Sequence, residues 1–421
     1  MKILFMNPRY ASPYKEWDIS DLKSSSPPLG LLSLAAVARK FNHSVEVMDL
    51  NTNEDKGFNP DLVGITAMTM QIENAAKVGK RLKESGVTTL LGGVHVTAEP
   101  YETLKRYPDS FDEIMTGEGE WQFANKLGET LGPDLDDLPF PAYDLVDLSK
   151  YRVSPIGTKD RNAVGIITSR GCFGKCEFCS KSVFGTNIRC HSAKYVVDLM
   201  DKLNIDHKVK DFLFYDDLFV GNKMRLKQIC ELLLNRKYSW SCCSRVDTLD
   251  LETMKLMKRA GCTMIEYGIE SGSQKILDLM KKGITKEKIV KAITMTHKAG
   301  ILSKGNFIFG YFGETEETLK ESIKFAKSIP LDYFQHTFMT PLPGTESWKK
   351  AEEHGTFDKN WDKCNTFSIN FVPRGITRER MIELSKYAFK SFYFRPIILL
   401  KELFRGSLFK KLKSFMKAII R

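Results

Sequence analysis

The sequence predicts an α/β protein in which a doubly wound, Rossmann-like domain precedes a partial (β/α)6 barrel of the TIM type and a helical C-terminal region. Short apolar runs rich in Val, Ile and Leu alternate with amphipathic segments, as in parallel sheets covered by helices. The 421 residues suffice for two or three domains with buried cores. A proline-rich stretch separates two series of βα units. We therefore expect domains at residues 1–132 and 161–345, a linker at 133–160, and a helical region with a basic amphipathic tail at 346–421.

The first domain contains four runs that we expect to form buried parallel strands, at residues 2–6, 45–49, 62–67 and 88–91. Helices are expected at residues 28–41, 72–85, 101–106 and 120–131. Pro27 and Pro28 fit the start of the first helix, because proline is tolerated in the first helical turn. A doubly wound sheet of this kind binds its ligands at the carboxyl ends of its strands.

A second βα series begins at Ala163 and contains six predicted strands. Their last residues are Thr168, Tyr215, Cys243, Ile269, Phe309 and Phe338. Amphipathic helices separate these strands, as expected for a partial barrel. The chemistry of such barrels lies at the face where the strands end, so motifs near these positions are the candidates for function.

The net charge of +11 is concentrated at the end of the chain. Between Arg374 and Arg421 there are 13 Lys or Arg and 3 Asp or Glu, a surplus of +10. The body of the protein is therefore not expected to bind nucleic acid or another polyanion. No run approaches the ~20 apolar residues of a membrane span, and the N-terminus lacks the pattern of a signal peptide, so we expect a cytoplasmic protein.

Three cysteines form the most specific motif of the chain. Cys172, Cys176 and Cys179 follow the spacing C-x3-C-x2-C on a loop after the apolar run 163–168. A [4Fe–4S] cluster normally takes four Cys ligands, so three would leave one iron open. Structural zinc, the alternative, needs four closed ligands, and only Cys190 and His191 offer a loose second pair. The spacing therefore favours an open iron–sulfur site.

This loop resembles the cluster loop of the radical S-adenosylmethionine (radical SAM) enzymes, whose pattern is C-x3-C-x-aromatic-C, with Phe178 as the aromatic residue. Later segments that resemble the barrel motifs of the same family are Tyr215-Asp216-Asp217, Ser-Arg245-Val-Asp, Gly268-Ile-Glu270-Ser271-Gly272, the run 305–314, and Pro341-Leu-Pro343-Gly344. The resemblance implies that the open iron binds the amino and carboxylate groups of S-adenosylmethionine. An electron from the cluster would then cleave this cofactor to a 5′-deoxyadenosyl radical.

By the same resemblance, side chains at the strand ends would hold S-adenosylmethionine. Phe178 is expected near the adenine, Tyr215 and Asp216 near the methionyl amine, and Arg245 with Glu270 near the ribose or carboxylate. The full set of expected residues is Phe178, Tyr215, Asp216, Asp217, Arg245, Glu270 and Ser271. Two structural interpretations stay open: Phe178 could be a core residue, and Arg245 could form a barrel salt bridge with Asp247 or Glu270.

The first domain resembles the cobalamin-binding domain that is fused to many radical SAM enzymes. It lacks G-x-G-x-x-G after its first strand. It has instead an ordered set of motifs that includes Pro28, Gly30, Thr66, Gly92, Gly93, His95, Gly117 and Glu118, which we expect to hold cobalamin. Gly92 and Gly93 would let a bulky ligand approach the backbone, and Thr66 could bond its polar tail. A vestigial or substrate-binding domain is the alternative.

No histidine follows the Asp-x-His-x-x-Gly pattern that places a His on cobalt in methionine-synthase-like sites. Many members of the fused family also lack that residue. We therefore expect bound cobalamin in a base-off form without a protein His on cobalt.

The resemblance implies a cobalamin-dependent radical methyltransferase that methylates an unactivated carbon. A cyclisation, rearrangement or ring-forming oxidation without methyl transfer is the alternative. No Cys precedes residue 172, which disfavours a methylthiotransferase, and a cobalamin sensor would not need the three-Cys loop. The substrate could be a small molecule, a lipid or a peptide, and we expect flavodoxin or ferredoxin as the electron donor.

The tail has an apolar stripe at helical spacing, formed by Leu408, Phe409, Leu412, Phe415, Met416 and Ile419. Lysines occupy the positions between. Two interpretations remain open: the helix packs its stripe on the barrel, or it lies on an anionic membrane surface as a peripheral contact.

Overall fold

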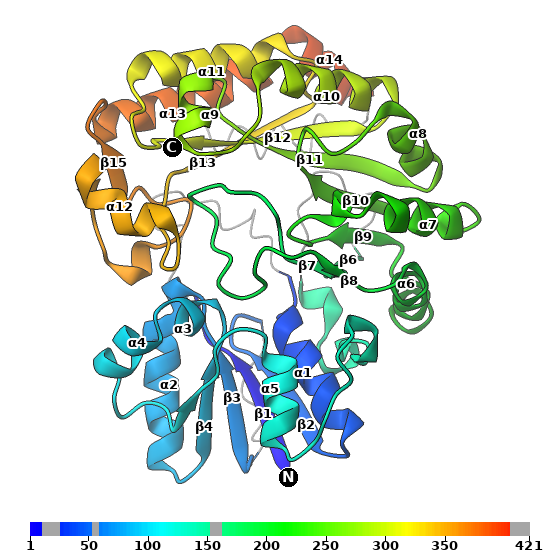
Figure 1. The fold of residues 1–421 in the computed structure, drawn as a ribbon, viewed down its shortest axis with the longest axis vertical. Coiled ribbons are helices and arrows are strands. Elements are labelled where there is room, and N and C mark those ends of the chain that lie inside the picture. Colours follow the sequence, from blue (N-terminus) through cyan, green and yellow to red (C-terminus); the bar gives the residue numbers. More distant parts are fainter. Residues whose placement is uncertain (11–25, 53–58, 152–161, 405–421) are drawn as a thin grey trace.

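The structure is a computed structural model that describes residues 1–10, 26–52, 59–151 and 162–404. Two parallel sheets lie one above the other, the first domain at the bottom of Figure 1 and the half-barrel at the top. One buried apolar cluster includes residues of both domains, among them Phe5 and Phe309. The predicted α/β architecture is confirmed.

The first domain is a five-stranded parallel sheet in the order β2-β1-β3-β4-β5. Its strands are β1 (Lys2–Asn7), β2 (Ser44–Asp49), β3 (Leu62–Thr66), β4 (Thr88–Gly92) and β5 (Glu113–Ile114). Its helices are α1 (Leu29–Lys40), α2 (Ile72–Glu84), α3 (Val94–Ala98), α4 (Pro100–Arg106) and α5 (Gly119–Lys126). The chain changes direction across the sheet between β1 and β3, and ligands of doubly wound sheets bind at such a switch point.

The four predicted strands and the first three predicted helices of this domain are present. The helix expected at residues 120–131 is shorter and ends at Lys126, because Gly128 adopts a positive φ of 79° that terminates the helical run. Strand β5 and helix α3 were not predicted, since two and five residues are too short to show a period.

The described part of the predicted linker, residues 133–151, packs against both domains. Three short 3-10 turns lie at Leu135–Asp137, Tyr143–Leu145 and Leu148–Lys150. The buried Tyr143 donates a hydrogen bond to the carbonyl oxygen of Gly165 (3.0 Å), and Tyr151 donates one to Asp49 in the first domain (3.1 Å). The expected linker is therefore a strap whose apolar side chains are part of the core.

The half-barrel contains six parallel strands in the order β13-β12-β11-β10-β9-β6, so each strand pairs with its neighbour in sequence. They are β6 (Ala163–Ile166), β9 (Asp211–Phe214), β10 (Ser239–Ser244), β11 (Cys262–Glu270), β12 (Leu302–Phe309) and β13 (Tyr333–Phe338). All six predicted strands are confirmed, with ends within two residues of the expected positions.

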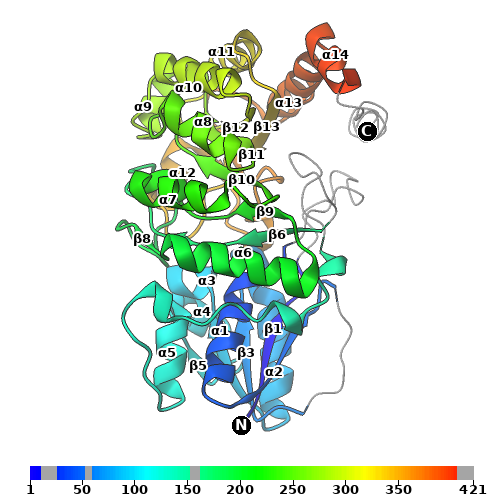
Figure 2. The same ribbon diagram turned by 90° about the vertical axis from the view of Figure 1, so that its right-hand side faces the viewer.

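Helices cover the outer face of this sheet, as Figure 2 shows for α6 to α8. They are α6 (Ala193–His207), α7 (Lys223–Leu233), α8 (Leu251–Arg259), α9 (Gln274–Leu279), α10 (Lys286–Lys298) and α11 (Glu316–Ser328). Two short strands, β7 (Ser169–Arg170) and β8 (Arg189–Cys190), pair antiparallel outside the barrel. They close the neck of the loop that carries the three predicted cluster cysteines.

The C-terminal region is not wholly helical, contrary to the prediction. It contains α12 (Glu346–His354), α13 (Arg378–Tyr393) and α14 (Pro396–Phe404), but also an antiparallel pair of β14 (Gly355–Phe357) and β15 (Phe371–Pro373). Three-residue strands are too short for an alternating pattern to reveal them. The amphipathic stripe predicted for residues 408–419 lies outside the described residues.

Within the described ranges, none of the helices combines the length and the apolar character required to span a bilayer.

Glu314 follows β12 and is fully buried. One carboxylate oxygen accepts a hydrogen bond from the amide of Gly310, while its Oε1 atom has no partner in the described part of the chain. Burial raises the pKa of Glu314 to about 8, so the folded protein keeps this carboxyl protonated at neutral pH.

We predict that the free energy of unfolding falls as pH rises between the ordinary pKa of Glu314, 4.5, and its folded value of about 8. Over that window the folded state binds a proton that the unfolded state has lost, and the slope is about 1.4 kcal/mol per pH unit. Glu314→Gln should reduce this slope. Denaturant titrations at several pH values measure it, with the exposed Glu379→Gln as control; an unchanged slope in Glu314→Gln would contradict the assignment.

Candidate functional site

The cluster loop, residues 171–188 between β7 and β8, lies between the two domains (Figure 1). Gly174 sits between two of its thiols: a Cβ atom there would lie 3.4 Å from the Sγ of Cys172 and 3.8 Å from that of Cys176. A hydrogen bond from Cys179 lowers the pKa of Cys176 to about 6, against the effect of burial and with help from the positive charge of Lys282. The loop thus brings the three predicted sulfurs together and favours a thiolate among them.

The donor set fits an iron–sulfur cluster better than zinc. Among the described residues, no three His, Cys, Asp or Glu side chains converge closely enough to hold a single metal ion. A structural zinc takes four closed ligands. Three thiols on one loop would instead leave one iron of a [4Fe–4S] cluster open.

Two ion pairs lie beside these thiols, one buried and one partly exposed. Lys282 binds Glu270 (2.7 Å), and both side chains are less than 10% exposed. Arg245 binds Asp247 (3.0 Å) and also donates to the carbonyl oxygen of Lys282 (3.1 Å). The structural interpretation of Arg245 is therefore realised with Asp247 and not with Glu270.

Lys282 carries no signal of its role in the sequence, where it follows a second lysine that is exposed. Its Nζ atom lies 5.7 Å from the ring centre of Phe178, and this ring meets that of Tyr311 edge-on at 6.3 Å. Phe178 is half-buried in a small apolar cluster, so the predicted adenine neighbour also has a packing role.

The Tyr215-Asp216-Asp217 motif divides into three roles. Asp216 is buried and accepts hydrogen bonds from the backbone and side chain of Thr168 and from Ser169, at 2.6–2.8 Å. Asp217 accepts one from the amide of Gly171 at the start of the cluster loop (2.9 Å). These two carboxylates hold the segment that follows β6, from Thr168 through β7 to the first residue of the cluster loop.

Tyr215 is exposed, with 38% of its surface accessible and its hydroxyl 3.1 Å from Ser26, and Asp217 is exposed as well. Ser271, a further predicted cofactor residue, is fully buried and shares a hydrogen bond with Ser322 (3.0 Å). Asp216 and Ser271 thus make hydrogen bonds within the fold, and their contact with S-adenosylmethionine stays a prediction.

The inner face of the half-barrel carries polar side chains. Side chains of β10 point alternately to the two faces of the sheet. Trp240 and Cys242 share one face and are buried, whereas Cys243 lies on the other face and is exposed. Cys243 pairs in register with Glu266, and Glu266 pairs with Lys304 on the next strand, where their side chains form an ion pair of 2.9 Å. These polar side chains in mid-sheet make the inner face the candidate substrate site.

The first domain has a partly open cavity of about 170 Å³ at the carboxyl ends of its strands. Predicted cobalamin residues that line it are Gly30, Thr66, Gly92, Gly93, Gly117 and Glu118. A Cβ atom on Gly92 would have its nearest neighbour 3.8 Å away, and one on Gly30 would have none within 4 Å. The glycines therefore leave room for a ligand against the backbone, as the prediction requires.

Val183 and Phe184 of the cluster loop also line this cavity. Sequence reasoning missed both residues, because they lie in the second domain and only the stacking of the two domains brings them to the first. The cavity is thus built jointly by the first domain and by the loop that carries the cysteines.

Pro28 and His95, two further predicted cobalamin residues, are not among the residues that line this cavity. The carbonyl oxygen of Pro28 accepts the first backbone hydrogen bonds of α1. His95 is buried in α3, with its Nδ1 atom 3.2 Å from the hydroxyl of Thr69 and its ring 4.5 Å from that of Trp361. Burial lowers the pKa of His95 to about 4, so this histidine is a neutral residue at the contact with the C-terminal region.

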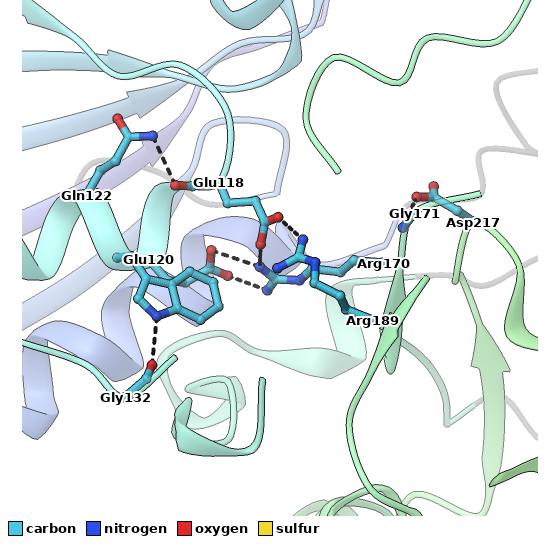
Figure 3. Close-up of polar contacts among 9 residues, drawn as sticks. Glu118, Glu120, Gln122, Gly132, Arg170, Gly171, Arg189 and Asp217 are labelled. Carbon is cyan, nitrogen blue, oxygen red and sulfur yellow. Dashed lines mark hydrogen bonds and ion pairs between the residues drawn. The ribbon is translucent and has the colours of Figure 1, made fainter. Parts of the chain in front are cut away.

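A network of ion pairs joins the wall of the cavity to the neck of the cluster loop (Figure 3). Arg170 binds both Glu118 (2.6 Å) and Glu120 (2.6 Å), and Arg189 also binds Glu118. Of these residues only Glu118 was predicted. Arg170 directly precedes Gly171 and Cys172, but an isolated arginine beside a motif carries no specific signal.

Comparison with known proteins identifies two domains. Residues 166–326 match the Radical SAM superfamily, and residues 18–125 match the B12 binding domain. An uncharacterized methyltransferase of Pyrococcus horikoshii is 34% identical, with 96% of this chain and 95% of that protein covered. The anaerobic magnesium-protoporphyrin IX monomethyl ester cyclase of Cereibacter sphaeroides is 27% identical, with 99% of this chain and 75% of that protein covered.

Among solved structures, the chain is similar to the radical S-adenosylmethionine methyltransferase TsrM of Kitasatospora setae with tryptophan and an S-adenosylmethionine analogue bound. The TM-score is 0.67 at 17% identity, with 91% of this chain and 88% of the other covered. This similarity extends the shared fold over both domains.

We predict that Gly92→Leu blocks cobalamin binding without unfolding the first domain. The new side chain would enter the cavity, and the Cβ position itself meets no close neighbour. Binding of hydroxocobalamin, followed by its visible spectrum, should weaken by more than about tenfold, or about 1.4 kcal/mol.

Thr88→Leu, at the exposed start of the same strand, is the control and should bind cobalamin as the unchanged protein does. Equal affinity of Gly92→Leu and the control would place the cobalamin site elsewhere.

Proposed function

This chain belongs to the cobalamin-dependent radical S-adenosylmethionine methyltransferases, and we propose that it methylates an unactivated carbon of a small molecule held on the inner face of the half-barrel. The observation that supports this most directly is the position of the cluster loop. It carries Cys172, Cys176 and Cys179, and its residues Val183 and Phe184 line the cavity of the cobalamin domain. One loop thus borders the sites of both cofactors.

The cofactors are a [4Fe–4S] cluster, S-adenosylmethionine and cobalamin. When bound, the first two supply abstraction of a hydrogen atom from carbon and cobalamin supplies the methyl group, chemistry that ordinary side chains cannot perform. The chain's own residues bind and orient these groups and exclude water from them.

We assign the cluster to the thiolates of Cys172, Cys176 and Cys179. Lys282 and Arg245 add positive charge that lowers the pKa of Cys176 and favours its ionised form. Tyr215, Arg245 and Glu270 stand at the strand ends nearest the loop and remain the proposed contacts of S-adenosylmethionine. Asp217 acts through the backbone of Gly171 and positions the loop.

We assign cobalamin to the cavity that Gly30, Thr66, Gly92, Gly93 and Gly117 line. Since His95 points into the contact with Trp361, the described part of this cavity offers no histidine, which supports base-off binding without a protein His on cobalt. The nitrogen splitting in the electron paramagnetic resonance spectrum of the cob(II)alamin form tests this assignment.

The inner face of the half-barrel supports a substrate with polar groups. It presents the ion pair of Glu266 and Lys304, and the Oδ1 atom of Asn306, for which the described residues provide no hydrogen-bond donor. A donor group on the substrate would satisfy this acceptor. An electron carrier such as flavodoxin or ferredoxin completes the proposed reaction by reducing the cluster.

A ring-forming reaction without methyl transfer is the second candidate, because one of the relatives is a cyclase. The two functions differ in their products. Methyl transfer yields S-adenosylhomocysteine together with a product heavier by one CH2 group, whereas ring formation yields neither.

We predict that replacing Cys172, Cys176 and Cys179 together by Ala abolishes both the four-iron cluster and reductive cleavage of S-adenosylmethionine. Iron analysis and chromatographic detection of 5′-deoxyadenosine after anaerobic reduction measure these quantities. The matched control replaces three other thiols, those of Cys190, Cys230 and Cys364, and should keep the cluster. A full complement of iron and normal cleavage in the first variant would contradict the assignment.

We predict that Cys243→Phe prevents methylation but leaves both the cluster and bound cobalamin in place. The larger side chain would fill part of the inner face, and the substitution replaces none of the residues assigned to the cluster or to cobalamin. Cell extract incubated with S-adenosylmethionine labelled in its methyl group should gain one labelled compound with the unchanged protein and none with the variant. Equal labelling by both proteins would exclude this face as the substrate site.

A further inference from the structure

Arg170 occupies an unusual position at the junction of the two domains. It is the last residue of β7, and two residues later the chain reaches Cys172. Its side chain is only 8% exposed and forks between two carboxylates: one nitrogen lies 2.6 Å from Glu118, the other 2.6 Å from Glu120 (Figure 3). Planar guanidinium groups bind carboxylates in this way with defined geometry.

Both carboxylates belong to the wall of the cobalamin cavity. Glu118 and Glu120 flank the first residue of α5, and both line the cavity. Arg189 of β8 binds Glu118 as well, so the two strands that close the neck of the cluster loop each contribute an arginine to this wall.

The charges of this network remain in place despite burial. Burial disfavours the charged form of Arg170, but the attraction of Glu120 outweighs it and raises the pKa of the guanidinium. Burial likewise opposes ionisation of Glu120, and Arg170 nevertheless lowers the pKa of this carboxyl. A buried pair of this kind is costly to break, because either partner alone is left charged without compensation.

The loop beyond Arg170 is fixed on its other side by the barrel. The amide of Gly171 donates to Asp217 after β9, and Gly171 has a φ of 91°, where a Cβ atom would collide with the carbonyl oxygen of Asn187. Phe184 of the same loop lies with its ring centre 5.1 Å from the guanidinium of Arg170 and lines the cavity. Arg170 therefore contacts the cavity wall on one side and the cluster loop on the other.

We infer that Arg170 is a positioning residue that couples the cluster loop to the cobalamin cavity, so that a loop ordered by its cluster holds the cavity in the form that binds cobalamin. The inference rests on the proposed function for the identity of the two cofactors. It differs from a purely structural ion pair, which would stabilise the protein equally whether or not the cluster is present.

The test is the ratio of two dissociation constants for hydroxocobalamin, measured on the full chain with and without its reconstituted cluster. Coupling predicts that the cluster-loaded form binds about tenfold more tightly than the cluster-free form. Arg170→Lys keeps the positive charge but cannot fork to both carboxylates, and should reduce the ratio to about one.

A second variant and a control distinguish a loss of coupling from a general loss of folding. Glu120→Gln removes the carboxylate and keeps its shape, and should also reduce the ratio. Arg236→Lys is the control, since Arg236, in the turn after α7, forks to both oxygens of Asp201 in α6 (2.9 and 3.0 Å). Its ratio should equal that of the unchanged protein. Circular dichroism of each variant verifies the fold.

A ratio that stays at the value of the unchanged protein in both Arg170→Lys and Glu120→Gln would overturn the inference. A loss of affinity that is equal in the two cluster states would overturn it too, because this is the signature of a structural pair. A ratio of one in the unchanged protein would show that the sites are uncoupled. Failure of the unchanged protein to bind cobalamin at all would instead refute the proposed function, and the inference with it.

Discussion

The cluster loop is held against two sheets at once, and the site depends on this double attachment. Residues 171–188 form no regular structure over most of their length, so the loop has few hydrogen bonds of its own to fix its shape. The pairing of β7 with β8 closes its neck, Arg170 ties that neck to the first domain, and Asp217 ties it to the barrel. Ordering a loop costs conformational entropy, and these buried polar contacts offset that cost where the thiols must stay together.

Buried charges recur around the loop, and each has a partner. Glu270 and Lys282 pair beside the thiols, and Arg170 pairs with Glu118 and Glu120 at the cavity wall. Such pairs contribute little net stability compared with apolar packing of the same volume. Their geometry is specific, however, and an apolar core would fix neither the register of the loop nor the charge beside the sulfurs.

The C-terminal region provides a second attachment between the domains. Trp361 packs against His95, and the guanidinium of Arg106 lies 4.6 Å from the centre of its ring. The strap adds another attachment, because Tyr151 binds Asp49 of the first domain. Both contacts fix the first domain at points other than the cluster loop. The relative position of the two domains around the cavity is therefore set by several separate contacts. Such a fixed arrangement suits a site in which cobalamin must face the cluster and S-adenosylmethionine.

The sequence by itself determined where the strands lie along the chain, the loop with three thiols and the glycines at the strand ends of the first domain. These features are local: the period of apolar residues defines a strand or helix, and the spacing of Cys172, Cys176 and Cys179 confines them to one loop. Only the tertiary structure decided that Lys282 pairs with Glu270, that Asp216 binds inward to Thr168, and that His95 meets Trp361 instead of the cavity. Arg170 and Glu120 are separated by 50 residues. Their contact exists because the two sheets stack on each other, and the partner of a buried charge is chosen by that packing and not by its neighbours in sequence.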